Sequence, residues 1–288
     1  MIARYVTAGL QELYPDVNFI VTNYETSEVG MQEIKKAKPD GLSLTVGSCV
    51  FMDNYLSGAS QVNPTTELVV ATKFNDGGPQ AWVARADAPY NNMVELAAYI
   101  KEHPMELTAG VAVGGTSHII WYSCLQELGV ADMVNYVQCG NEADKLTMIA
   151  SNSLDISNCS IKNADGYYKD GRLKILGIVG PAIATRDYTA EFTGFDLDDS
   201  YLSMPEQGLK TTWEAGAYIM LPAGTPDEIV QAVSEKCLAL ETNATFKDGM
   251  KVMGSMGSVK NLADSQADWA YEWDFQQQVT TAMGLNVR

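Results

Sequence analysis

Gly114-Gly115-Thr116-Ser117-His118 follows a short apolar run and opens a segment in which apolar side chains recur at helical spacing. A glycine pair followed by hydroxyl residues is typical of a helix start, where the first backbone N–H groups have no partner inside the helix. Such a terminus attracts anions, because its unpaired N–H groups carry partial positive charge. This stretch therefore predicts a glycine turn and a helix whose first turn can bind a negatively charged ligand.

Strand and helix patterns alternate on both sides of this stretch. Phe19-Ile20-Val21 and residues 42–46 have strand patterns, and residues 31–37 have a helical one. Asn92 is predicted to cap a second helix, and Thr225, followed by a proline and two acidic residues, to cap a third. This alternation favours an α/β fold.

The length of the chain indicates two lobes, since 288 residues are more than one hydrophobic core usually holds. Apolar strands at residues 81–84 and 217–221 flank a central segment, and we expect them to carry the chain to a second lobe and back. Lobe 1 is then residues 1–82 and 214–288, and lobe 2 is residues 83–213. A ligand cleft is expected between the lobes.

The charge balance excludes some partners. There are 36 acidic and 19 basic residues, which give a net charge of -17. This charge disfavours nucleic acid and anionic membrane surfaces as partners. No apolar run approaches the roughly 18 residues that a membrane-spanning helix needs.

Catalytic and metal-binding patterns are also missing from the sequence. The five cysteines are far apart and odd in number, so they fit neither a zinc site nor a full disulfide framework, and we expect most to be buried as small apolar side chains. His118 next to Ser117 is not a catalytic triad, because adjacent residues do not readily supply the required geometry. We expect no enzyme activity, no metal and no cofactor.

Four segments occur in an order that resembles a known family. They are Lys38-Pro39-Asp40-Gly41 before a strand ending at Gly47-Ser48, the glycine-rich start at Ser117-His118, Asp155 followed by Gly171-Arg172-Leu173, and Leu221-Pro222-Ala223-Gly224-Thr225-Pro226. In this order they resemble the solute receptors of tripartite tricarboxylate transporters, the Bug-type periplasmic binding proteins. The resemblance covers nearly the whole chain.

The resemblance implies a two-lobed periplasmic-binding-protein fold that closes by hinge motion on a small organic anion, usually a carboxylate. It implies a monomer that delivers the anion to the permease subunits of a membrane transporter, in the periplasm or another extracytoplasmic space. In this family two loops hold the carboxylate, and one corresponds here to Gly114–Ser117. The other follows a first strand that would precede Met1. Because the chain begins within a helical pattern, we expect a trimmed N-terminus without its signal segment.

The candidate ligand-binding residues each have a structural alternative. They are Ser48, Gly114, Gly115, Thr116, Ser117, Asn158, Ser160 and Trp213. Gly114–Ser117 could be an ordinary helix start and Ser48 a turn residue, while Asn158 and Ser160 could cap local backbone and Trp213 could fill the core. Cys159 stands where the family often has an aspartate. An alternative function is a sensory binding module or an enzyme on a similar two-lobed fold.

Overall fold

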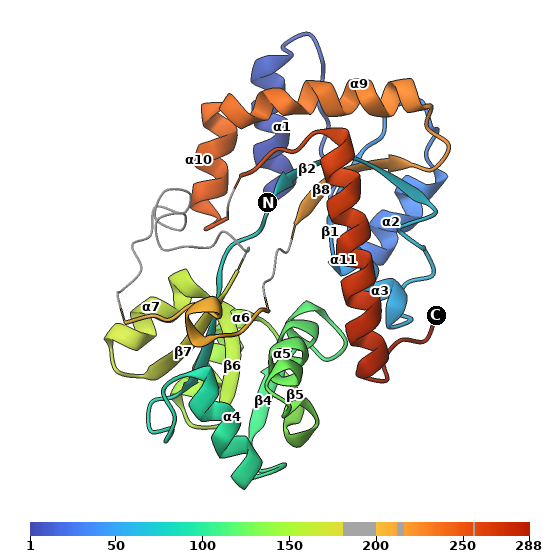
Figure 1. Cartoon of the computed structure of the whole chain (residues 1–288). Coiled ribbons are helices and arrows are strands. Elements are labelled where there is room, and N and C mark those ends of the chain that lie inside the picture. Colours follow the sequence, from blue (N-terminus) through green and yellow to red (C-terminus); the bar gives the residue numbers. More distant parts are fainter. Residues whose placement is uncertain (181–199, 212–215, 256) are drawn as a thin grey trace. The chain divides into compact units, whose positions relative to one another are not determined.

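The computed structural model describes residues 1–180, 200–211, 216–255 and 257–288 (Figure 1). The chain forms two compact units, the first from residues 1–77 and 215–288 and the second from residues 78–214. The boundary predicted at residues 82/83 falls inside strand β3 (Gln80–Arg85). β3 pairs along its length with two strands of the second unit, so the whole strand belongs to that unit.

A three-stranded antiparallel sheet forms the centre of the first unit. Strand β8 (Ala217–Pro222) lies between β1 (Thr45–Ser48) and β2 (Leu68–Asn75). Successive side chains of a strand point to opposite faces, and Tyr218 and Ile219 accordingly pack in two different apolar clusters. Because both faces of this sheet are apolar, both need to be covered by helices.

Helices cover both faces of this sheet. In the described part of the first unit they are α1 (Ile2–Leu13), α2 (Ser27–Lys36), α3 (Val50–Leu56), α9 (Asp227–Leu238), α10 (Ala244–Val252) and α11 (Leu262–Ala282). Helices α2, α3 and α11 contribute to the cluster around Tyr218, whereas α1, α9 and α10 contribute to the cluster around Ile219. Figure 1 shows the long α11, in red, running beside β2.

A five-stranded mixed sheet forms the centre of the second unit. Its strands, in spatial order, are β5 (Asn135–Gln138), β4 (Thr108–Val111), β6 (Ile156–Ser160), β3 and β7 (Leu173–Val179). The first three are parallel, and β3 runs antiparallel to both β6 and β7. The carboxyl ends of β4, β5 and β6 therefore meet at one edge of the sheet.

Helices begin at this edge and cover both faces of the second sheet. They are α5 (Thr116–Glu127), α6 (Glu142–Ala150) and α7 (Ile161–Lys169), while α4 (Met93–Glu102) follows β3. Helices α6 and α7 pack against the face that holds Ala81 and Val83. The neighbouring Trp82 points to the other face and stacks on Trp121 of α5, with ring centroids 4.3 Å apart. Helices α5 and α6 thus lie on opposite faces.

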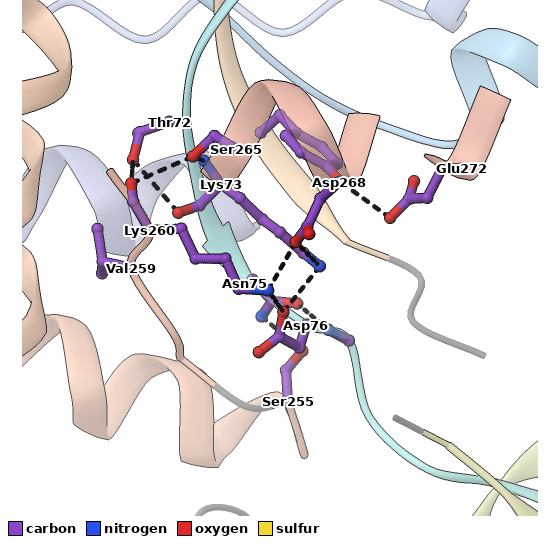
Figure 2. Close-up of polar contacts among 12 residues, drawn as sticks. Thr72, Lys73, Asn75, Asp76, Ser255, Val259, Lys260, Ser265, Asp268 and Glu272 are labelled. Carbon is purple, nitrogen blue, oxygen red and sulfur yellow. Dashed lines mark hydrogen bonds and ion pairs between the residues drawn. The ribbon is translucent and has the colours of Figure 1, made fainter. Parts of the chain in front are cut away.

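A buried ion network lies at the end of β2 in the first unit (Figure 2). Lys73 is 1% exposed, and its Nζ lies 2.9 Å from Asp76 Oδ1 and 2.9 Å from Asp268 Oδ2. Lys260 Nζ approaches the same Asp268 oxygen at 2.6 Å. Burial alone raises the pKa of Asp268, but hydrogen bonds from Lys260 and Lys73 outweigh burial and hold this pKa below its ordinary value. The network joins β2 to α11 and to the segment before it.

Local sequence signals differ in how well they predict these elements. The Asn92 side chain accepts a hydrogen bond from the Glu95 N–H and caps α4, as predicted. The predicted strand at residues 19–21 is wrong, because no described strand lies beside this segment to pair with it, and Ile20 is 81% exposed. Thr225 does not cap α9, since its hydroxyl donates to the Pro222 carbonyl and the helix begins two residues later.

Candidate ligand-binding site

The first turn of α5 follows the carboxyl end of β4, as the sequence predicts. Gly114 has a φ of 77°, a left-handed conformation that favours glycine, and Gly115 is the N-cap residue. Gly115 supplies no side chain to cap the helix. The backbone N–H groups of this turn that have no carbonyl partner inside the helix therefore have to find partners elsewhere.

Some of these N–H groups are already paired. The Gly114 N–H donates to His118 Nδ1 at 3.2 Å, and the Gly115 N–H donates to the Ala112 carbonyl at 2.9 Å. The Ser117 N–H has no partner among the described residues. Ser117 Oγ accepts from the Ala112 N–H at 2.8 Å, which leaves the hydroxyl hydrogen available as a donor. The donors available to an anion at this turn are thus centred on Ser117.

His118 has a structural role at this turn. It is buried, and its ring lies 4.5 Å from that of Tyr136. Because Nδ1 accepts a hydrogen bond, the neutral ring carries its proton on Nε2. Burial lowers the pKa of His118 to about 4, so the imidazole stays neutral at pH 7. Protonation would remove the acceptor that holds the Gly114 N–H.

His118 makes stability depend on pH. The pKa is about 4 in the folded chain and 6.5 ordinarily, so the unfolded state binds the proton more tightly. The free energy of unfolding should therefore fall between pH 6.5 and pH 4, by about 2 kcal/mol from this group. His118→Asn keeps an acceptor near Gly114 but cannot titrate.

Urea unfolding at pH 7 and pH 4.5 checks this prediction. The difference between the two pH values should be smaller in His118→Asn than in the wild type. The same substitution at the half-buried His103 of the same unit is the matched control. Equal pH dependence in wild type and His118→Asn would contradict a depressed pKa at His118.

Asn158 and Ser160 lie at the carboxyl end of β6, next to β4 in the sheet. The topology therefore brings them to the same edge as the start of α5. Both have partners from α6: Asn158 Oδ1 accepts from Lys145 Nζ at 3.0 Å, and the Ser160 N–H donates to Glu142 Oε1. Six of the eight predicted residues, namely Gly114, Gly115, Thr116, Ser117, Asn158 and Ser160, thus gather at one edge of the second sheet.

Lys145 is a residue at this edge that the sequence analysis missed. It is only 7% exposed although it is a lysine. A signal was present, because Lys145 lies four residues before the buried Ile149 and so shares the apolar side of α6. A lysine on the apolar side of a helix indicates a buried charge that needs a partner, since lysine is almost never fully buried unless it is paired.

The remaining predictions fall elsewhere. Ser48 ends β1 in the first unit, where it pairs with Ala217, and Trp213 lies outside the described residues.

All five cysteines are buried with free thiols, as expected. Within the described residues, no cluster of histidine, cysteine and acidic side chains is arranged to hold a metal ion. The helices described also lack the length and hydrophobicity needed to cross a bilayer.

The two α/β units and their strand order define the fold of the two-lobed periplasmic binding proteins. A sequence model of the tripartite tricarboxylate transporter family receptor matches residues 2–259. The chain therefore belongs to this receptor family, and it is a solute receptor of that transporter type. This confirms the family and the fold class predicted from the ordered motifs.

Individual relatives are distant. A UPF0065 protein of Bordetella pertussis is 23% identical over 264 residues, which cover 85% of this chain and 73% of the relative. A TctC solute-binding protein from Polaromonas, solved without ligand, has a TM-score of 0.78 at 19% identity, covering 98% of this chain and 92% of that one. An R. palustris protein solved with adipate has a TM-score of 0.73 at 19% identity, covering 99% and 92%.

Proposed function

We propose that this receptor binds a small organic carboxylate outside the cytoplasm and delivers it, as a monomer, to the permease subunits of a tripartite transporter. The family match and the adipate bound by a structural relative support this assignment. The observation that carries it is the first turn of α5, where Ser117 offers an unpaired N–H and a hydroxyl hydrogen at the carboxyl edge of a sheet. Sites of α/β proteins collect at such edges.

The receptor binds its solute and releases it unchanged. We further propose that the two units act as lobes that close on the solute by hinge motion. Ser48, in the first unit, and Trp213 remain candidate contacts to the solute. The residues at the edge of the second sheet are the primary contacts.

A thermal-shift screen with adipate, malate and citrate tests the proposal. An acid present at 100 times its dissociation constant should stabilise the chain by about 2.7 kcal/mol, which shifts the melting temperature by a few degrees. Nuclear magnetic resonance of the acid after incubation should show no chemical change. If none of these acids, nor any other di- or tricarboxylate in the screen, shifts the melting temperature, the proposal fails.

Ser117→Asp sharpens this test. An aspartate in the first turn of a helix is favourable for the helix, but its charge repels an anion at the same place. The variant should therefore keep its melting temperature without ligand and lose the shift caused by the acid. Ala244→Asp adds the same charge to the first turn of α10, in the first unit, and should leave binding unchanged. Equal shifts in both variants would exclude the first turn of α5 as the binding site.

A further inference from the structure

Lys145 is a buried cation that lacks an anionic partner. Its Nζ has one hydrogen bond, to Asn158 Oδ1, and no carboxylate lies within 4.0 Å among the described residues. Lys73, the other deeply buried lysine, has two carboxylates at 2.9 Å. A buried charge without a partner is costly, and two of the three N–H donors of Lys145 have no acceptor. This arrangement suits a counter-ion that arrives from outside the protein.

The neighbours of Lys145 do not replace that counter-ion. Burial lowers the pKa of Lys145, and Cys139, Cys159 and Glu142 act in the opposite direction. Burial raises the pKa of the Cys159 thiol, so this thiol is neutral at pH 7. Glu142 is the acidic group that influences Lys145, but its Oε1 already accepts from the Ser160 N–H. No neighbouring group among the described residues therefore neutralises the positive charge of the Lys145 ammonium group.

The path of the Lys145 side chain places its ammonium group at the edge of the sheet. Helix α6 packs on the face of Ala81, whereas Asn158 pairs with Trp82 and so has its side chain on the opposite face. A side chain cannot pass between two hydrogen-bonded strands. Pairing of β4 with β6 ends at Gly110 and Ser157, one residue before Asn158. Lys145 thus reaches Asn158 beyond the last paired residues, where β4 leads into the turn before α5.

This position is open to a ligand. Asn158 Nδ2 has no hydrogen-bond partner among the described residues, and it is not among the unpaired atoms that are sealed from solvent. The amide is held by Lys145 with its oxygen toward the ammonium group and its nitrogen free to donate. An ammonium group with two free donors and an amide N–H thus adjoin each other at the edge where α5 begins.

We propose that Lys145, together with Asn158, binds a carboxylate group of the solute and makes the receptor selective for acids with two or more carboxylates. One carboxylate binds at the first turn of α5 and a second at Lys145. This inference rests on the proposed function and adds the class of solute to it. Solutes with a positively charged amino group at that end are rejected, because the ammonium group of Lys145 repels them.

The test compares Lys145→Met, Lys145→Arg and Lys101→Met with the wild type by isothermal titration. The probes are adipate, malate and citrate, with hexanoate as an acid that has a single carboxylate. Lys145→Met should weaken the tightest of the three polycarboxylates about 10- to 100-fold and leave hexanoate nearly unchanged. Lys145→Arg should retain more of the affinity. Lys101 is an exposed lysine of α4, and its replacement controls for the change in net charge.

Melting temperatures without ligand separate this role from a structural one. Removing an unpaired buried charge should leave the melting temperature of Lys145→Met equal or higher, whereas a structural lysine would lower it. If Lys145→Met binds polycarboxylates within threefold of the wild type, the inference is wrong and the proposed function stands. If the wild type binds none of the acids, the proposed function fails and the inference fails with it.

Discussion

Replacing the buried Lys73 by methionine is expected to lower the free energy of unfolding by about 3–5 kcal/mol. Methionine has nearly the shape of lysine, so packing is conserved and the charge is lost. Among the described residues, the cationic partner left to Asp76 would then be Lys260, whose Nζ lies 4.0 Å from Asp76 Oδ1. An acidic side chain that is nine-tenths buried would lose its close cationic partner. Urea unfolding at pH 7 measures this effect.

The matched control is the same substitution in an exposed ion pair. Lys36 Nζ lies 3.3 Å from Glu33 Oε1, and both side chains are at least half exposed. Lys36→Met should change stability by no more than about 0.5 kcal/mol, because surface pairs of this kind contribute little. Adding Asp76→Asn to Lys73→Met should recover a large part of the loss, since it removes the unpaired charge. Equal stability of Lys73→Met and the wild type would contradict the role of the network.

Trp121→Ala, in the second unit, is expected to lower the free energy of unfolding by an amount similar to that for Lys73→Met. Trp121 and Trp82 are both fully buried, and their rings are stacked at 4.3 Å with 29° between the planes. Removal of a buried aromatic side chain costs about 3–5 kcal/mol, because apolar contacts are lost and a cavity remains. Trp121 also fixes α5 on the sheet, so its loss should loosen the first turn of that helix.

Hydrogen exchange followed by mass spectrometry can locate this effect. Peptides from residues 108–127 should exchange faster in Trp121→Ala, while peptides from α11 should be unchanged. Trp121→Phe keeps a ring in place and should lose less stability. Tyr271→Ala, at a side chain that is 70% exposed, is the control for loss of an aromatic ring. Unchanged exchange in α5 of Trp121→Ala would show that the tryptophan pair does not hold this helix.

Signals that act within a few residues allowed much of the fold to be predicted. The glycines before Thr116 and the Asn92 cap both specify a helix start through backbone geometry and one local hydrogen bond, and both starts lie where the sequence placed them. The ordered motifs identified the receptor family. Thr225 failed as a cap because its hydroxyl had a nearer acceptor in the preceding turn.

Features that depend on distant residues were not predictable in this way. A strand pattern at residues 19–21 does not make a strand without a neighbour to pair with. The contact of Lys145 with Asn158 requires the packing of α6 on the sheet, which the sequence does not state. The fold thus brings six of the eight predicted site residues to one edge of the second sheet, and their role in binding stays a prediction. The buried Lys145 at the same edge was not predicted.

The position of β8 between β1 and β2 has a consequence for the order of folding. The two early strands of the first unit have no bond to each other, and both pair with the strand that follows residue 216. Their sheet therefore forms only when the whole segment between Asn75 and Ala217 is closed into a loop, which costs chain entropy. The strands of the second sheet all lie within that segment, so the second unit can fold before the first.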